Sequence, residues 1–255
     1  MKNLIITIIL LLAIEPLFAQ HAHFTSSGTI EFEKTVNMYA LIKKDMEGED
    51  DDTFSKMAFE AYQKANPQFK KLKATLTFGD NKMLYKPAPN EDVSRKMGDV
   101  YADQINTTYT DLNTHSNIIE KVIYGESFLV KDSVRKVKWK ITDETREIAG
   151  YTCRRANGLI MDSVYVVAFF TNKIPVFGGP ESFTGLPGMI LGVVLPHENI
   201  NWFATKVIDT PIPPLTIVPP KKGKVVNRKQ LHTELNGALK NWGKSGLFEL
   251  RLFML

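Results

Sequence analysis

The residue types best suited to covalent chemistry stand near a Gly/Pro-rich stretch, IPVFGGPESFTGLPG (174–188). Ser182 lies beside Glu181, and His197 follows later, so the three could supply a nucleophile, a carboxylate and a base. The GxSxG pattern of the nucleophile elbow is absent from the sequence. The single cysteine, Cys153, shares one face of an alternating stretch with Tyr151, which indicates a buried apolar position. We therefore assign no catalytic residue, and a hydrolase with groups near the Gly/Pro turn stays an alternative.

Patterns for metals and cofactors fail on spacing. The five histidines form neither a metalloprotease helix nor a Cys/His zinc pattern. The acidic stretch 45–52 has Asp50 where a calcium loop needs glycine. His21 and His23 could hold Cu(II) with a free amine at Gln20, but that residue can cyclise and remove the amine. No phosphate loop or dinucleotide fingerprint is present, so we expect no metal and no cofactor.

The stretch FTGLPGMIL (183–191) places a Pro-Gly pair inside an apolar run. Pro187 fixes φ at the second turn position and Gly188 permits a positive φ at the third, which predicts a type II turn. The turn is interpreted as scaffold, with a binding site at its rim. The predicted structural turn consists of Gly185, Leu186, Pro187 and Gly188. The candidate ligand- or partner-binding residues are Phe177, Glu181, Ser182 and Phe183.

Alternating apolar residues predict strands on both sides of this turn, at a spacing near ten residues. Helical spacing over 53–66 and 227–242 predicts two principal helices. The apolar chain end, 247–255, is expected to dock as a last strand. The predicted fold class is mainly β (α+β): a strongly curved antiparallel sheet or half-open barrel with these two helices.

The N-terminal residues indicate export. Lys2, an apolar run over 4–14 and Ala19 have the layout of a secretory signal peptide over residues 1–19, with an uncleaved anchor as the alternative. Residues 20–255 then form a single domain without an internal disulfide. No later segment is long and apolar enough to span a bilayer, so we expect no integral span after cleavage. The formal net charge of +4 does not indicate a nucleic-acid partner.

The Pro-Gly turn and its flanks resemble the GLPGLI family of secreted bacterial proteins. The motif matches at Gly185, Leu186, Pro187, Gly188 and Ile190, with Met189 where leucine is usual. The flanks IAGYTCRRA (148–156) and AFFTNKIPVFGGPESF (168–183) agree with the family pattern as well. The resemblance implies an exported protein without known catalytic residues, often associated with energy-coupled outer-membrane transport.

The expected function is thus a binding or accessory protein of the cell envelope with an unknown ligand. Its expected location is the periplasm or the outer membrane, and an outer-membrane transporter or another envelope protein is the expected partner. The alternatives are the hydrolase and a structural protein that docks a partner through Phe177 and Phe183.

Overall fold

The structure is a computed structural model that describes residues 24–46, 53–89, 98–213 and 215–255. The predicted signal peptide, the copper candidates His21 and His23, and most of the acidic stretch lie outside the described residues. Among the residues that are described, no helix is long and apolar enough to cross a membrane.

Twelve strands form one sheet in the order β12-β6-β5-β4-β3-β2-β1-β11-β10-β9-β8-β7. Their bounds are β1 (Gly28–Asn37), β2 (Phe69–Gly79), β3 (Lys82–Pro87), β4 (Asn106–Asp111), β5 (Ser116–Ile123), β6 (Glu126–Ser133), β7 (Lys140–Ile148), β8 (Tyr151–Ile160), β9 (Val164–Thr171), β10 (Met189–Leu195), β11 (Ile200–Ile208) and β12 (Lys224–Val226). The sheet is curved and does not close into a barrel, which confirms the predicted mainly-β fold class.

The sheet consists of two consecutive meanders. Strands β1 to β6 pair in chain order, and so do β7 to β11. The meanders meet where β1 pairs antiparallel with β11, from Thr29 opposite Ile208 to Val36 opposite Ile200. Only β12, which pairs with β6, runs parallel to its neighbour within the described sheet.

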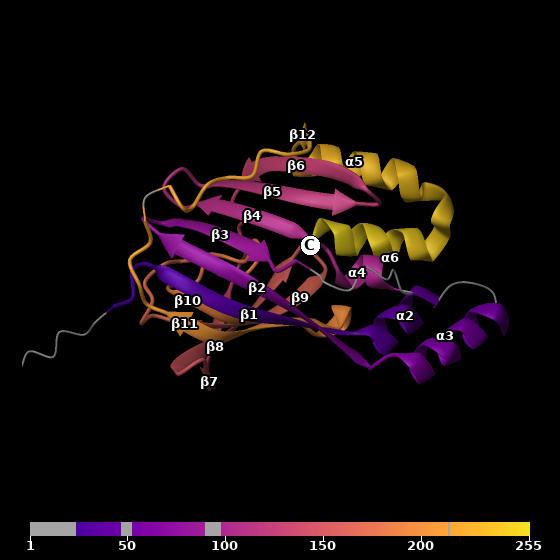
Figure 1. Cartoon of the computed structure of the whole chain (residues 1–255), viewed down its shortest axis with the longest axis horizontal. Helices are drawn as coiled ribbons and strands as arrows, with labels where there is room; N and C mark the ends of the chain where they lie inside the picture. Colours follow the sequence, from indigo (N-terminus) through magenta and orange to yellow (C-terminus); the bar gives the residue numbers. More distant parts are fainter. Residues whose placement is uncertain (1–23, 47–52, 90–97, 214) are drawn as a thin grey trace, which may run out of the picture.

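The two sides of the sheet are tied together by residues 134–139, here named the seam segment. It joins the end of β6 to the start of β7, which lie at opposite sides of the sheet. Strands are about 4.8 Å apart, so a flat sheet would separate β6 from β7 by roughly 50 Å. The seam segment reaches at most about 25 Å. The sheet must therefore curl until its two sides approach each other (Figure 1).

Helices gather at one end of the curled sheet (Figure 1). The helical elements are α2 (Met38–Met46), α3 (Thr53–Ala65), α4 (Asp99–Ala102), η1 (Pro196–Glu198), α5 (Arg228–Leu239), η2 (Lys240–Trp242) and α6 (Gly243–Met254). The two predicted helices are found as α3 and α5. A capping box starts α5, because Asn227 accepts from the Gln230 amide while the Gln230 side chain accepts from the Asn227 amide.

The predicted last strand over 247–255 was wrong, because most of that segment belongs to helix α6. Phe248 and Leu252 pack into the main core, whereas Leu250 and Phe253 pack into a second cluster with α5 and β6. A helix buried on two sides is apolar nearly all round, so its sequence loses the polar stripe that marks a helical period.

The connection from β9 to β10, residues 172–188, is largely buried and is named here the plug loop. Ile174, Val176, Phe183 and Leu186 belong to the main core together with inward residues of both meanders. The loop is held by backbone bonds to β10, including Met189 N to Ile174 O at 3.0 Å and Ile190 N to Gly178 O at 2.7 Å. The plug loop thus fills the inside of the curved sheet.

Candidate functional site

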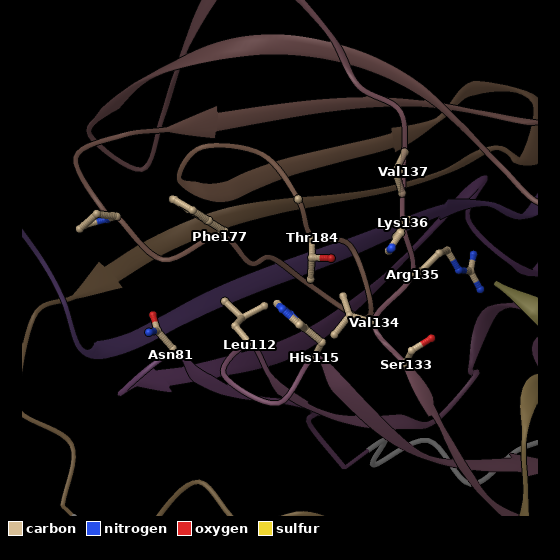
Figure 2. A pocket seen from close by; sticks show the side chains of 12 residues that line it. Asn81, Leu112, His115, Ser133, Val134, Arg135, Lys136, Val137, Phe177 and Thr184 are labelled. Atoms are coloured by element: carbon tan, nitrogen blue, oxygen red, sulfur yellow. The ribbon is translucent and has the colours of Figure 1, made fainter.

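A cavity of about 890 Å³ opens where the plug loop meets the seam segment and the turns after β2 and β4 (Figure 2). Most of its exposed lining is apolar, with contributions from Leu112, Val134, Val137, Pro175 and Phe177. Its polar and flexible lining consists of Asn81, His115, Ser133, Arg135, Lys136, Thr184 and Gly185. A cavity of this size and composition can enclose a small organic molecule.

Alternation along the plug loop directs Phe177 to this cavity. Ile174 and Val176 are buried in the core, whereas Phe177, which directly follows Val176, is 52% exposed. Figure 2 shows Phe177 on the same side of the view as Leu112, with the His115 ring beside Leu112. Phe177 is therefore an apolar side chain that the core does not use, whereas Leu112 is partly buried against the core.

The seam segment forms the opposite wall and is fixed to the plug loop. Trp139 Nε1 donates to the Thr184 carbonyl at 2.9 Å. Val137 and Trp139 lie so close to β8 that a Cβ added at Gly158 would come within 2.9 Å of each of them. These contacts hold the wall in place without occupying the cavity.

The wall formed by the seam segment carries two basic side chains, Arg135 and Lys136. His115, Arg135 and Lys136 line the cavity, and no carboxylate does. Arg135 Nη2 donates to the Met254 carbonyl at the end of α6, at 2.9 Å. Burial, with a further contribution from Arg228, lowers the pKa of Arg135 to about 10, so the guanidinium stays charged at neutral pH.

The structure divides the sequence-predicted site residues between the cavity and the core. Phe177 and the turn residue Gly185 line the cavity. Glu181 and Ser182 are buried inside the plug loop, and the Phe183 ring lies 5.9 Å from the ring of Trp202 in the core. The four candidate binding residues therefore do not form one surface.

Glu181 instead belongs to a buried charge cluster with Lys34 of β1 and Lys121 of β5. Burial is the largest influence on each group. It raises the pKa of Glu181, against the opposing effects of both lysines and of a hydrogen bond from Asn106. It lowers the pKa of Lys34, and it lowers the pKa of Lys121 to about 8. Shifted pKa values of this kind are typical of functional sites and also of structural ion pairs.

The two lysines are fixed by backbone carbonyls from the helical end of the molecule. Lys34 Nζ donates to Ala102 O at 2.9 Å, and Lys121 Nζ donates to Phe253 O at 3.0 Å. A small cavity of about 30 Å³ adjoins Lys34, Glu181 and Tyr85, which is room for a water molecule and little else. The buried charge cluster therefore joins the plug loop to the sheet and to α6, and it leaves no space for an organic substrate.

Sequence reasoning selected Phe177 and Gly185 of the cavity and Glu181 of the buried charge cluster, but it missed the other residues of both sites. A signal was present for the two lysines. Ile30, Phe32, Lys34 and Val36 alternate onto one buried face, so that Lys34 stands at an inward position of β1. Lys121 stands at an inward position between Ile119 and Ile123 of β5 in the same way. A lysine at an inward strand position is a sign of a buried partner.

The groups weighed for catalysis do not assemble. His197 is exposed in η1, where its ring lies 6.4 Å from the Tyr165 ring, whereas Ser182 is buried in the plug loop. The Cys153 thiol is buried, and burial with a contribution from Glu147 raises its pKa to about 12. Among the described residues, no group of three or more His, Cys, Asp or Glu is placed to hold a metal ion.

The Pro-Gly turn is tighter than the expected type II turn. Gly188 has the expected positive φ of 146°, but its amide donates to Leu186 O at 2.8 Å. This bond closes a three-residue turn centred on Pro187. The Met189 amide, which would close a four-residue turn, instead bonds Ile174 O.

Comparison with known proteins gives a family model for one segment and a shared fold. Residues 158–192 match the model of a family described as "Protein of unknown function (Porph_ging)". This segment runs from the end of β8 through β9 and the plug loop into β10. No curated protein matches the sequence.

Two solved structures of PNGF-II resemble the chain in fold. They have TM-scores of 0.51 and 0.50 at 13% and 14% identity, and the similarity covers 86% of this chain. The chain spans about a third of the length of PNGF-II, since the matches cover 33% and 34% of it.

Proposed function

We propose that this chain is an exported binding protein that holds a small, largely apolar molecule in the cavity between the plug loop and the seam segment. The observation that carries the proposal is the cavity itself, about 890 Å³ in volume and lined mainly by apolar side chains. The two walls are fixed by the Trp139–Thr184 hydrogen bond and by core packing, so the site is formed before the ligand arrives.

We further propose the setting of this function. The motif Gly185–Ile190 and its flanks support a place in the GLPGLI family, and the family model matches the same part of the chain. Cleavage after Ala19 would release residues 20–255 as one domain in the periplasm or at the outer membrane. There the protein would serve an outer-membrane transporter or another envelope protein as an accessory that carries the ligand.

The test is binding of a neutral apolar dye, N-phenylnaphthylamine, to residues 20–255, followed by fluorescence. Val134 lines the cavity, so Val134→Trp should fill part of it and weaken dye binding by about tenfold or more. Val225 of β12 is 62% exposed and does not line the cavity, so Val225→Trp is the matched control and should bind as the wild type does.

The comparison requires that both variants have the same thermal unfolding midpoint as the wild type. If the dye binds the wild type and both variants with equal affinity, the ligand site lies elsewhere. If the folded wild type does not bind the dye, the cavity does not function as an apolar site.

A further inference from the structure

We infer that the buried charge cluster of Lys34, Lys121 and Glu181 is a binding site for internal water, which bridges the three charges and Thr108. The small cavity beside this cluster shares no lining residue with the proposed ligand cavity. The inference is therefore independent of the proposed function. It follows from charges that act on one another without direct contact, and from two buried polar atoms beside them that have no partner.

The three charges influence one another across a gap. Burial raises the pKa of Glu181, and Lys34 and Lys121 both oppose this shift. Nevertheless, among the described residues no ion pair joins either ammonium group to the Glu181 carboxylate. Polar groups that act on each other over such a separation are commonly bridged by water.

The two ammonium groups have donors left for a bridging molecule. Each lysine is only 5% exposed, so bulk water does not reach these donors freely. An ammonium group has three N–H donors, and Ala102 O takes one from Lys34 while Phe253 O takes one from Lys121. A buried donor without an acceptor is costly, so the remaining donors require acceptors inside the protein.

Two neutral polar atoms beside the cluster are buried without a partner. Trp202 Nε1 and Thr108 Oγ1 form no hydrogen bond with the described residues. Trp202 is paired with Lys34 across β11 and β1, and its ring centroid lies 5.4 Å from Lys34 Nζ. Thr108 follows Asn106, which donates to Glu181, by two residues on the inward face of β4. Enclosed polar atoms of this kind are generally satisfied by ordered water.

Tyr85 connects these groups to the small cavity. It stands opposite Thr108 in the pairing of β3 with β4, and it lines the cavity of about 30 Å³ with Lys34 and Glu181. Burial raises the pKa of Tyr85 and the Trp202 indole opposes this shift, although Nε1 does not reach hydrogen-bond geometry with any group. A water molecule needs about 10–15 Å³, so the cavity has room for water and excludes an organic ligand.

The chemistry of the surrounding groups favours water over an ion of similar size. The ammonium groups and the indole donate, whereas the Glu181 carboxylate accepts. Water can accept from the donors and donate to the carboxylate at the same time. A halide ion only accepts, and the carboxylate would repel it.

The direct test is a high-resolution crystal structure of the protein from crystals soaked in sodium bromide, with anomalous data collected at the bromine edge. We expect density for at least one water within about 2.7–3.2 Å of a lysine Nζ and of a second polar atom of the site, without an anomalous peak. An anomalous peak there would assign the site to a halide and overturn the inference. Absence of density between the charges would also overturn it.

A pair of variants tests in solution whether Thr108 is one of the partners of the water. Thr108 and Thr110 are both inward residues of β4 and both 2% exposed, but Thr110 Oγ1 accepts from Asn117 Nδ2 at 2.9 Å. If water bonds Thr108 Oγ1, Thr108→Val should lower the thermal unfolding midpoint by about 2–4 °C. Thr110→Val, the matched control, should lower it at least as much because a known hydrogen bond is lost. A midpoint that stays constant or rises in Thr108→Val alone would overturn the assignment of Thr108 to the water site.

Discussion

At the scale of single residues, the unusual feature is a set of ionisable groups at positions that strands normally give to apolar side chains. Lys34 and Lys121 face inward, and Glu181 approaches them from the plug loop with a left-handed φ of 51°. A buried charge is costly unless it is paired and hydrogen-bonded. Each lysine donates to a backbone carbonyl, and the Glu181 carboxylate supplies an opposing charge that acts on both.

Removing the carboxylate should therefore destabilise the protein strongly. Glu181→Gln keeps the size of the side chain but removes the carboxylate whose charge acts on both buried lysines, and we expect a loss of about 3–5 kcal/mol in the free energy of unfolding. Glu144 pairs with Arg155 on the surface with 64% of its side chain exposed, so Glu144→Gln is the control and should cost less than about 1 kcal/mol. Urea unfolding of both variants measures the difference. Equal losses would show that the Glu181 carboxylate does not offset the buried charge of the lysines.

Lys121 should give stability a distinct pH dependence. Burial holds its pKa near 8 in the folded protein, against 10.5 for a free lysine. Between these values the unfolded chain binds a proton that the folded protein does not, so the free energy of unfolding rises with pH by up to about 1 kcal/mol per unit. Below pH 8 both states are protonated and this contribution is flat.

The measurement is the difference in unfolding free energy between wild type and Lys121→Met from pH 7 to 11, in which the other titrating groups cancel. The difference should move in favour of wild type above about pH 8. Lys138, exposed in the seam segment, provides Lys138→Met as the matched control for loss of a lysine. A difference that stays constant over the whole range would contradict the assignment.

At the scale of elements, the local sequence of the plug loop predicts part of the conformation of the loop but not all of it. Pro187 and Gly188 predicted a turn with a positive φ at Gly188, and the structure has both. The hydrogen bond that closes the turn differs, because the Met189 amide is taken by Ile174 at the other end of the loop. The choice of partner depends on how the whole loop closes, which residues 185–188 do not encode.

Gly188 should be far less tolerant of a side chain than a helical glycine. A Cβ at Gly188 would lie 2.1 Å from the Thr171 carbonyl oxygen, so the backbone must move. We expect Gly188→Ala to cost about 2 kcal/mol or more in thermal or urea unfolding. Gly237 lies in α5 with open space around its Cβ position, so Gly237→Ala should stabilise by about 0.5–1 kcal/mol. Similar effects of the two substitutions would contradict this account of the turn.

Helices were predicted only where one face is polar. The periodicity of α3 and the cap at Asn227 identified α3 and α5. Helix α6 went unrecognised because it is buried against two clusters, and its short alternating stretches match a strand equally well. Tertiary packing, rather than local preference, decides the conformation of such a segment.

At the scale of the whole molecule, antiparallel neighbours were predictable and the closure of the sheet was not. Strand spacing indicated a meander, since consecutive strands joined by short turns pair locally. The pairing of β1 with β11 joins residues that are far apart in the chain, and no local pattern specifies it. The cavity shares this difficulty, because its walls come from β2–β3, β4–β5, the seam segment and the plug loop. Only Phe177 and Gly185 of its lining were selected from sequence.

The junction of the meanders should control global stability. If β1 and β11 separate only when the whole sheet unfolds, their central amides should exchange with deuterium in one class, at the slowest rate in the protein. Amides of the edge strand β7 should exchange faster. Measurement of native-state hydrogen exchange by mass spectrometry tests this. Faster exchange in β11 than in β1 would mean that the second meander opens by itself.

The position of Glu181 in the chain also bears on when the N-terminal half can fold during synthesis. The first meander, β1 to β6, emerges complete by Ser133, with the inward ammonium groups of Lys34 and Lys121 facing a space that nothing yet fills. Asp103 offers Lys34 an opposing charge within this meander, whereas the carboxylate that acts on Lys121, Glu181, arrives nearly fifty residues later on the plug loop. Until then, burial of this interior would leave the Lys121 ammonium without an opposing charge, so we expect the N-terminal half to stay open while the rest is synthesised. The late position of Glu181 would thus delay the hydrophobic collapse of the first meander.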